Sequence, residues 1–182
     1  MKLGRSKAII GTLASGIGAF VVVPVVYWFI IRALDSAVGW RYDLAGMPAL
    51  IASAASFLIG LYWVLWAWSY LVFVGQGLPM EAFGVALHPT RVLVTNGPYA
   101  YTRNPMILGV LFIMAGVALL QGSKFGLILL PADVALISLY LVVFEENGLK
   151  RRFGADYEAY RHNVPQLLPR LSAYVHVPVE QG

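Results

Sequence analysis

The sequence predicts an all-α, polytopic membrane protein with about four transmembrane helices, a C-terminal helical hairpin and a cytosolic C-terminal tail. Composition is the first reason. Of the 182 residues, 59% are hydrophobic and 12% are charged, about half the charged fraction usual in a soluble domain. The second reason is that the charged residues lie between long uncharged runs and are not spread along the chain. Part of the solvent around this protein is therefore expected to be lipid.

The first uncharged run covers residues 8–31 and is long enough to cross a bilayer, which takes about 20 residues of helix. Lys2, Arg5 and Lys7 precede it, as basic residues do in a signal peptide. The run is longer than a signal-peptide core, however, and ends in no small-residue cleavage site. We therefore expect a retained helix, joined to the next one by a polar connection over residues 32–46.

The second uncharged run covers residues 47–74. As a helix it would be about 42 Å long, so it must tilt or project beyond a hydrocarbon core of about 30 Å. Residues 75–103 form the longest polar stretch and contain Pro79, Pro89 and Pro98. Because neither a helical nor a strand period dominates this stretch, we expect a loop that holds at most a short strand or helix.

Two further apolar segments, residues 106–120 and 127–144, are separated by a turn. The first would rise only about 22 Å as a helix, so the pair is predicted to form a helical hairpin that need not cross the full bilayer. The polar chain from Glu145 onward is expected to start as a helix and to finish as irregular structure on the membrane surface. We divide the chain into N-terminal transmembrane helices, residues 1–74, and a core, residues 75–182, within one structural domain.

The distribution of Lys and Arg predicts the orientation. With four helices and both termini in the cytoplasm, ten basic residues lie inside and three outside, which is a strong positive-inside bias. We therefore expect an integral protein of the inner or plasma membrane, with lipid and not nucleic acid as the partner of its basic clusters. The inside group is Lys2, Arg5, Lys7, Arg91, Arg103, Lys150, Arg151, Arg152, Arg161 and Arg170, and the outside group is Arg32, Arg41 and Lys124.

Two kinds of site are excluded by residue counts. The sequence has no cysteine, which rules out disulfides, thiolate metal sites and thiol catalysis. His88, His162 and His176 share no ligand spacing, so no metal site is predicted.

The hairpin predicts a polar site. Because a hairpin returns the chain to the face it left, the segment before it and the segment after it should meet at the cytoplasmic edge of the bilayer. The first segment contains Tyr99, Tyr101 and Arg103, and the second contains Glu145 and Glu146. Each residue alone is explained by an ordinary role, as an interfacial anchor, a belt aromatic or a solvated helix end. Their convergence favours a site for a polar ligand.

Asn104 and Pro105 favour a helix start, with Asn at the N-cap and Pro at the first helical position. The free amide groups and positive potential of a helix N-terminus suit a carboxylate ligand. Arg103 beside them could bind the same carboxylate through two parallel hydrogen bonds.

Several motifs in order resemble a known family. The string GPYAYTRNPM is followed, after a hairpin of about 40 residues, by EENGLKRRFGADYEAYRHNVPQLLP, and it is preceded by the segment GQGLP. Together they resemble the isoprenylcysteine carboxyl methyltransferase family and its bacterial relatives over residues 75–169, about half of the chain. Phospholipid methyltransferases share the Asn-Pro-Met and Glu-Glu elements. The sequence departs from the family pattern at Asn104, where the family has histidine, and at Ile107, where it has tyrosine.

The resemblance implies an enzyme that uses S-adenosylmethionine, bound at the cytosolic face, to methylate a lipophilic substrate. It implies that Arg103 and the 104–105 helix start hold the cofactor carboxylate. One of the two glutamates would accept from the ammonium or the ribose, and Tyr99 or Tyr101 would pack on adenine. The candidate catalytic residues are Arg103, Glu145 and Glu146. The candidate cofactor-binding residues are Gly97, Pro98, Tyr99, Tyr101, Arg103, Asn104, Pro105, Glu145, Glu146 and Tyr157.

Three functions stay open on the sequence. The first is methylation of a prenylated or similar lipophilic carboxylate or thiol, and the second is N-methylation of a phospholipid amine. The third is a non-catalytic membrane subunit that keeps the fold, a reading that Ile107 favours. Trp63, Trp66 and Trp68 either line an access path for a lipophilic substrate or, as tryptophans in membrane helices more often do, serve packing.

Overall fold

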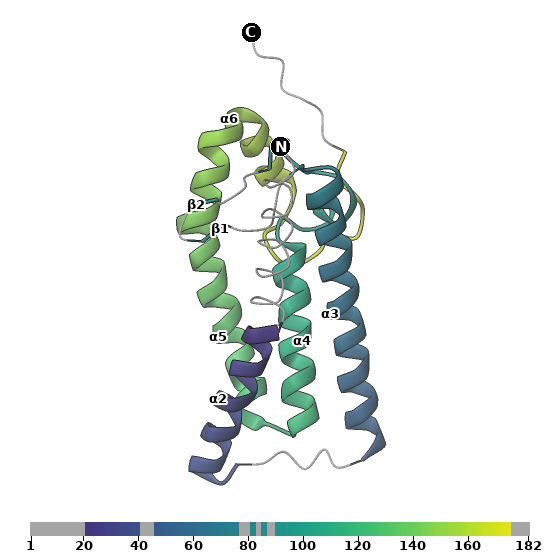
Figure 1. Cartoon of the computed structure of the whole chain (residues 1–182), viewed down its shortest axis with the longest axis vertical. Coiled ribbons are helices and arrows are strands. Elements are labelled where there is room, and N and C mark those ends of the chain that lie inside the picture. The colour runs from purple at the N-terminus through teal and green to yellow at the C-terminus, as the bar shows by residue number, and fades with distance from the viewer. Residues whose placement is uncertain (1–20, 41–45, 77–80, 83–84, 87–89, 176–182) are drawn as a thin grey trace, which may run out of the picture. The chain divides into compact units, whose positions relative to one another are not determined.

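The structure is a computed structural model that describes residues 21–40, 46–76, 81–82, 85–86 and 90–175. Almost all of the regular structure in these ranges is helical, which confirms the predicted all-α class. The described α-helices, drawn in Figure 1, are α2 (Val23–Val38), α3 (Met47–Phe73), α4 (Pro105–Gln121), α5 (Lys124–Tyr140) and α6 (Glu146–Asn163).

Two helical stretches of the described chain are long and apolar enough to cross a membrane. One is α3, with 27 residues, and the other is the 40-residue stretch Lys124–Asn163. That stretch joins α5 to α6 through a π-helical turn, η3 (Leu141–Glu145). Its apolar part is α5 with η3, whereas α6 is rich in charged residues and is taken to lie outside the bilayer. The helix α4 is apolar but shorter, and the number of spans and the side on which the tail lies stay predictions.

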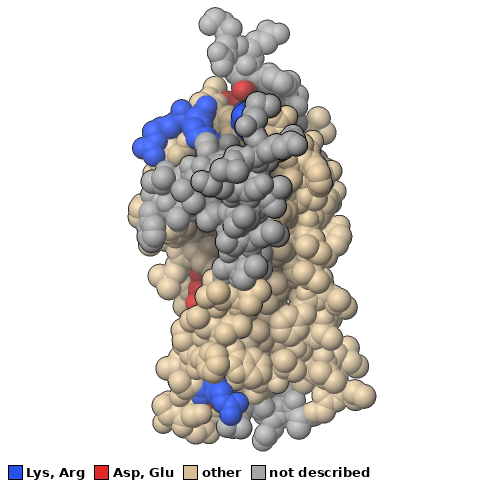
Figure 2. Space-filling view, in the orientation of Figure 1, with Lys and Arg blue, Asp and Glu red and all other residues tan. Residues whose placement is uncertain are grey.

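The exposed surface of these helices is apolar. Phe29 on α2, Leu58 on α3 and Leu136 on α5 are 65%, 68% and 66% exposed. In Figure 2, most of the described surface in view carries no charged side chain. A water-soluble protein rarely presents so many large apolar side chains together, so this surface supports the membrane class.

The helix α2 ends later in the chain than the sequence predicts. Residues 8–20 of the expected first helix lie outside the described residues. Its described part continues to Val38, through the stretch from Arg32 that was expected to be a polar connection. The helix can continue through these charged residues because each has a suitable environment. Arg32 is exposed, and the buried Asp35 accepts a hydrogen bond from the Phe125 amide at 3.2 Å. The helix ends where Gly39 adopts a left-handed φ of 68°.

The helix α3 follows the predicted run of residues 47–74 closely. It packs on α4 through small residues, as helices in membranes commonly do. A Cβ on Gly60 would lie 2.6 Å from the Gly109 carbonyl oxygen, so the two backbones are almost in contact there. Close by in the sequence, the buried Ser53 hydroxyl donates to the Gly116 carbonyl at 2.9 Å.

The described part of the connection from α3 to α4 is largely irregular, as expected. It holds an antiparallel pair of two-residue strands, β1 (Glu81–Ala82) and β2 (Val85–Ala86), in which Glu81 is opposite Ala86. A short 3₁₀ helix, η2 (Gly97–Ala100), follows before α4 begins.

A reversal within α6 brings distant residues of that helix together. Gly154 has φ 52° and ψ −126°, which is not a helical conformation. In a straight helix, Glu146 and Arg161 would be about 22 Å apart along the axis. The kink at Gly154 instead allows Arg161 Nε to lie 3.1 Å from Glu146 Oε2.

The chain divides into two compact units. One comprises Met1–Leu61 and Gly109–Asp133, and the second comprises Tyr62–Leu108 and Val134–Gly182. This is a different division from the boundary at residue 75 suggested by the sequence, which stays a prediction. Every candidate site residue falls in the second unit, so the site is described within that unit.

Candidate functional site

An ion pair between Arg103 and Glu146 lies at the centre of the candidate site. Arg103 precedes α4 and Glu146 opens α6, so these are the two ends of the predicted hairpin. Arg103 Nη1 lies 2.9 Å from Glu146 Oε1, and the two side chains are only 11% and 8% exposed. The structure therefore brings together one arginine and one of the two glutamates singled out in the sequence.

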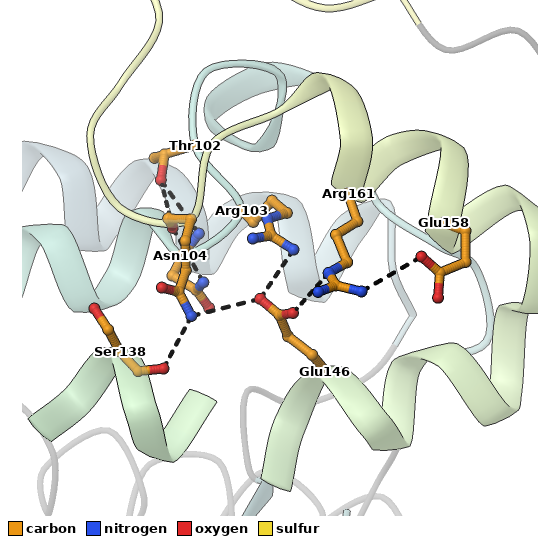
Figure 3. A network of polar contacts seen from close by, with 8 residues as sticks. Thr102, Arg103, Asn104, Ser138, Glu146, Glu158 and Arg161 are labelled. Atoms are coloured by element: carbon orange, nitrogen blue, oxygen red, sulfur yellow. Dashed lines mark hydrogen bonds and ion pairs between the residues drawn. The ribbon is translucent and has the colours of Figure 1, made fainter. Parts of the chain in front are cut away.

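Glu146 has further partners on both of its oxygens. Arg161 Nε is 3.1 Å from Oε2, and the Gln166 amide donates to Oε1 at 3.4 Å. Figure 3 shows Glu146 between the two guanidinium groups, with Glu158 beyond Arg161. These partners offset the desolvation of a buried carboxylate. Each oxygen of Glu146 therefore lies beside a guanidinium group, and Arg161 is shared with Glu158 at 3.5 Å.

The segment that follows α6 runs beside the segment that precedes α4. Three backbone hydrogen bonds join them, from the amide of Arg103 to the carbonyl of Pro165 (2.9 Å), from that of Arg170 to Tyr101 (2.9 Å) and from that of Tyr174 to Ala100 (3.0 Å). The tail therefore runs along residues 100–103 through main-chain contacts that side-chain patterns do not reveal.

Gln166 fastens the tail at several points. Its carbonyl accepts from the Thr102 hydroxyl at 3.0 Å and from the Asn104 side-chain amide at 3.1 Å. Its own amide donates to the Ser138 carbonyl at 3.1 Å as well as to Glu146. Through its side chain and its backbone carbonyl, this one residue connects α5, the start of α6 and the approach to α4.

The start of α4 agrees in part with the predicted Asn104 N-cap and Pro105 first helical position. Pro105 is the first residue of the helix, and the Asn104 carbonyl accepts from the Leu108 amide at 3.0 Å, as an N-cap carbonyl does. The side-chain nitrogen of Asn104, however, donates to the tail. Asn104 is therefore placed to hold the tail, a role that the Asn-Pro pair alone does not indicate.

Gly97 and Pro98 shape the turn before α4. Gly97 has φ +57°, and a Cβ there would lie 2.3 Å from the ring of Tyr70. Pro98 is fully buried. These two residues form a close-packed support beneath the site and expose little of their own surface to a ligand.

Three tyrosines of the site are buried in two separate clusters. Tyr99 is buried in a cluster with Ala67 and Val94, so its ring is enclosed by protein. Tyr157 and Tyr160 are buried in a second cluster with Val164, and the Tyr160 hydroxyl donates to the Tyr99 carbonyl at 2.7 Å.

Burial sets the protonation state of these tyrosines. It raises the pKa of Tyr99 and of Tyr160 well above the ordinary value. It also raises the pKa of Tyr157, which Glu146 and Glu145 raise further and which Arg103 lowers. All three hydroxyls therefore stay neutral donors at physiological pH.

Tyr101 is half-buried and ends a chain of aromatic rings. Its ring centroid is 6.0 Å from that of Trp66, which is 5.6 Å from Trp63 and 6.4 Å from Tyr70. We call Tyr62, Trp63, Trp66, Tyr70 and Tyr101 the aromatic column. Two of the three tryptophans noted in the sequence belong to it, and both pack against neighbouring rings.

Glu145 is the last residue of η3 and is half-buried. The pKa of Tyr99 is raised chiefly by burial, then by Tyr160, and then by the charge of Glu145. The charge of Glu145 also raises the pKa of Tyr157. Glu145 is adjacent in sequence to Glu146.

The Arg103 guanidinium has hydrogen-bonding capacity to spare. Its Nε and Nη1 are buried, and neither has a hydrogen-bond acceptor in suitable geometry among the described residues, although Nη1 is paired in charge with Glu146. Buried donors without acceptors are uncommon in folded proteins. They are expected where a ligand supplies the acceptor.

The site also contains residues that sequence reasoning missed, namely Arg161, Gln166 and Ser138. Arg161 and Gln166 both lie in the string that carries the family resemblance, but nothing in their spacing relates them to Arg103. They reach it only through the kink at Gly154 and the return of the tail. A glycine in the middle of a charged helical segment was the one available signal.

Among the described residues, no group of three or more His, Asp or Glu side chains is arranged to hold a metal ion.

The chain is similar in sequence to a known protein family. Residues 48–156 match the model of the family described as phospholipid methyltransferase. The chain belongs to the phospholipid methyltransferase family. The matched stretch contains Arg103, Glu145 and Glu146 and ends before Arg161 and Gln166.

Two relatives are similar to parts of the chain. One is methanethiol S-methyltransferase 2 of Bradyrhizobium diazoefficiens, 33% identical over 147 residues, covering 74% of this chain and 54% of the relative. The other is protein-S-isoprenylcysteine O-methyltransferase of Schizosaccharomyces pombe, 33% identical over 79 residues, covering 43% of this chain and 34% of the relative. The chain thus spans about half of the first relative and a third of the second. No solved structure matches the chain.

Proposed function

We propose that this protein is an S-adenosylmethionine-dependent methyltransferase of the membrane whose cofactor site is built around Arg103. The observation that carries the proposal is the buried Arg103 guanidinium, whose Nε has no hydrogen-bond acceptor among the described residues. It occurs in a chain that belongs to a family of methyltransferases. Gly97 and Pro98 shape the turn that leads to Arg103, and Pro105 begins α4.

The residues present fit the chemical groups of this cofactor. Its carboxylate matches the Nε donor of Arg103, which has no acceptor among the described residues. Its ammonium or ribose hydroxyls require a carboxylate acceptor, for which Glu145 and Glu146 are the candidates. Its adenine requires an aromatic surface, which the half-buried Tyr101 offers and the enclosed Tyr99 does not.

When bound, the cofactor supplies a methyl group on a positively charged sulfur. The residues of the chain then have three tasks, which are to bind that group, to orient it toward the acceptor and to exclude water. Positioning and desolvation account for much of the rate of such a displacement. A carboxylate acceptor needs no base, whereas an amine or a thiol must first lose a proton.

For the acceptor we propose a lipophilic thiol or carboxylate that reaches the site from the bilayer. The names of the two relatives refer to a thiol and to an isoprenylcysteine, which supports this class. The aromatic column leads from α3 to Tyr101 and offers an apolar path to the site. Phospholipid N-methylation is the second candidate, which the description of the family favours.

The location in the cell is part of the proposal. We propose an integral protein of the inner or plasma membrane, with both termini and the cofactor site on the cytoplasmic side. The positive-inside distribution of Lys and Arg supports this orientation.

Calorimetry on the purified protein in lipid nanodiscs tests the cofactor. We expect binding of S-adenosylmethionine and of S-adenosylhomocysteine, lost in Arg103→Ala and kept in Arg91→Ala, because Arg91 is exposed. If the wild-type protein binds neither compound, the proposal is wrong.

Mass spectrometry of labelled methyl transfer tests the acceptor. The protein is offered a long-chain alkyl thiol, an S-prenylated cysteine and phosphatidylethanolamine, with a host lipid extract as a broader source. Label in the first or second compound supports the main candidate, and label in the phospholipid alone supports the second. Cofactor binding without transfer to any of these would instead indicate a non-catalytic subunit.

A further inference from the structure

We propose that a second polar site, in the first unit, binds the headgroup of a phospholipid that carries a primary ammonium group. The site is a cavity of about 240 Å³, lined by residues of α2 and by the end of α4. Its lining residues are Trp28, Arg32, Asp35, Ser36, Leu120 and Gln121. All six belong to the unit that contains none of the candidate cofactor residues, and those of α2 precede residue 48, where the family match begins.

The cavity has the size of a headgroup. Sites for small molecules usually measure about 300–1,000 Å³, so a cavity of about 240 Å³ suits a few polar groups and not a whole cofactor. It opens to the surface, because Arg32, Ser36 and Leu120 are exposed. A lipid can therefore place its headgroup here while its acyl chains lie along the exposed apolar side chains of α2, such as Val25 and Phe29.

The two charged side chains of the cavity do not pair with each other. Arg32 and Asp35 are one turn apart on α2, yet no ion pair or hydrogen bond joins the Arg32 side chain to another residue of the described ranges. Asp35 is 6% exposed and accepts a hydrogen bond from the Phe125 amide. Because a buried carboxylate without a counter-ion is costly, the site favours a ligand that carries a positive and a negative group.

Two helix ends add negative potential beside Asp35. Asp35 and Ser36 lie in the last turn of α2, and Gln121 is the last residue of α4. The carbonyl end of a helix favours a positive charge, but neither helix has a basic residue in its last turn. The Gln121 side-chain amide is held at the cavity by donating to the Trp28 carbonyl at 3.0 Å. A ligand ammonium would supply the missing charge, and its N–H groups match the side-chain oxygens of Asp35 and Gln121.

The order of residues along α2 matches the order of groups in such a lipid. The helix is uncharged up to Ile31, and Arg32 follows directly. Asp35 lies three residues further, about 4.5 Å along the helix axis away from the uncharged part. In a phospholipid with an amino headgroup, the phosphate likewise follows the acyl chains, and the ammonium lies beyond the phosphate. The phosphate therefore meets the Arg32 guanidinium when the ammonium reaches Asp35, whichever face of the membrane α2 reaches.

Native mass spectrometry of the full chain, with lipids of identical acyl chains and no cofactor, tests this site. Phosphatidylethanolamine offers a phosphate and an ammonium with N–H groups, phosphatidylcholine has no N–H group, and phosphatidylglycerol has no positive charge. We expect the wild type to retain one phosphatidylethanolamine about tenfold more tightly than either of the others, as for a hydrogen bond between charged groups. Equal retention of the three lipids would overturn the proposal.

Two substitutions separate the two contacts. Arg32→Gln should weaken all three lipids about tenfold and keep their order, because each has a phosphate. Asp35→Asn should weaken phosphatidylethanolamine and remove its preference over phosphatidylglycerol, because only the former is positively charged at this position. If Arg32→Gln retains lipid as the wild type does, or Asp35→Asn folds and keeps the preference, the assignment is wrong.

Lys124→Gln and Asp133→Asn are the matched controls. They remove the same charges from residues of the first unit that do not line the cavity, and they should retain lipid as the wild type does. Unfolding temperatures accompany each measurement. Should Asp35→Asn fail to fold, the wild-type lipid order and Arg32→Gln, which changes an exposed side chain, still decide.

Free phosphoethanolamine separates a lipid from a soluble ligand, because it carries both charges and no acyl chain. It should displace the bound lipid only at far higher concentration than the lipid itself. Displacement at equal concentration would assign the cavity to a soluble compound and overturn the lipid. The proposal does not rest on the proposed function, since lipid retention without cofactor and binding of S-adenosylhomocysteine are separate measurements.

Discussion

Single residues carry much of the local geometry, and Gly97 is the clearest case. Its φ of +57° is favourable only for glycine, and a Cβ would overlap the ring of Tyr70 at 2.3 Å. We expect Gly97→Ala to lower the free energy of unfolding by about 2–4 kcal/mol, through backbone strain and displacement of Tyr70. Thermal unfolding in detergent measures this loss.

Gly39→Ala is the control for this change. Gly39 also has a positive φ, of +68°, but a Cβ there would meet nothing within 4 Å. It should therefore lose only the conformational part, about 1 kcal/mol. Equal losses in the two variants would show that contact with Tyr70 is unimportant.

The buried tyrosines predict a response to alkaline pH. Since burial raises the pKa of Tyr99, Tyr157 and Tyr160 above the ordinary 10.0, the folded protein keeps its protons longer than the unfolded chain does. Their contribution to stability is therefore complete below pH 10.0 and is lost as pH rises above it.

Absorbance of tyrosinate tests this directly. We expect Tyr157→Phe to leave the titration of the folded protein unchanged as pH rises through 10.0, because Tyr157 does not ionise there. A smaller absorbance change in the variant would mean that Tyr157 titrates as an exposed tyrosine does.

At the scale of elements, the kink in α6 determines whether the site forms. Gly154 has φ 52° with open space around its Cβ position, so Gly154→Ala meets backbone strain alone, about 1–3 kcal/mol. Straightening the helix would separate Arg161 from Glu146. We expect a lower unfolding temperature together with weaker binding of S-adenosylhomocysteine.

The control is again Gly39→Ala, which imposes a smaller strain of about 1 kcal/mol at the end of α2. It should lower stability and leave ligand affinity unchanged. If both variants bind as the wild type does, the kink has no part in ligand binding.

The elements also show what the sequence can predict. Uncharged runs gave α3 and α4 almost to the residue, because a helix in lipid must be apolar along its length. The same criterion failed for α2, where Arg32 and Asp35 interrupt the apolar run and the helix continues. Hydropathy reports where lipid is, whereas a helix ends where its hydrogen bonds end.

The candidate site could also be predicted only in part. Hairpin topology brought Arg103 and Glu146 together, because it relates the ends of two neighbouring elements. Arg161 and Gln166 reach the site through one glycine conformation and through main-chain bonds of an irregular tail. Neither leaves a periodic pattern in the sequence, so no reading of spacing could have placed them.

At the scale of the whole molecule, the exposed apolar residues predict stable insertion in the membrane. Leu58→Arg places a charge on the exposed face of α3 and should reduce insertion, at a cost of about 2.5–3.5 kcal/mol near the centre of a helix. Alkaline carbonate extraction of membranes measures the fraction retained. Leu171→Arg, at a fully exposed position of the tail, should be retained like the wild type. Equal retention of both variants would mean that α3 does not face lipid.

Orientation can be tested with single cysteines, because the chain has none of its own. We expect Leu171→Cys to react with a membrane-impermeant maleimide only from the cytoplasmic side. Val38→Cys, at the exposed end of α2, should react only from the opposite side. Labelling of both positions from the same side would contradict the predicted arrangement.

The aromatic column gives the protein an optical signal of its own. Trp66 lies 6.0 Å from Tyr101, and Tyr101 is two residues from Arg103, so an adenine packed on Tyr101 would change the surroundings of that indole. Emission from Trp66 should then shift or be quenched on binding, and the signal should vanish in Trp66→Phe while the other four tryptophans remain. Cofactor loading can thus be followed by fluorescence in native membranes without an attached dye.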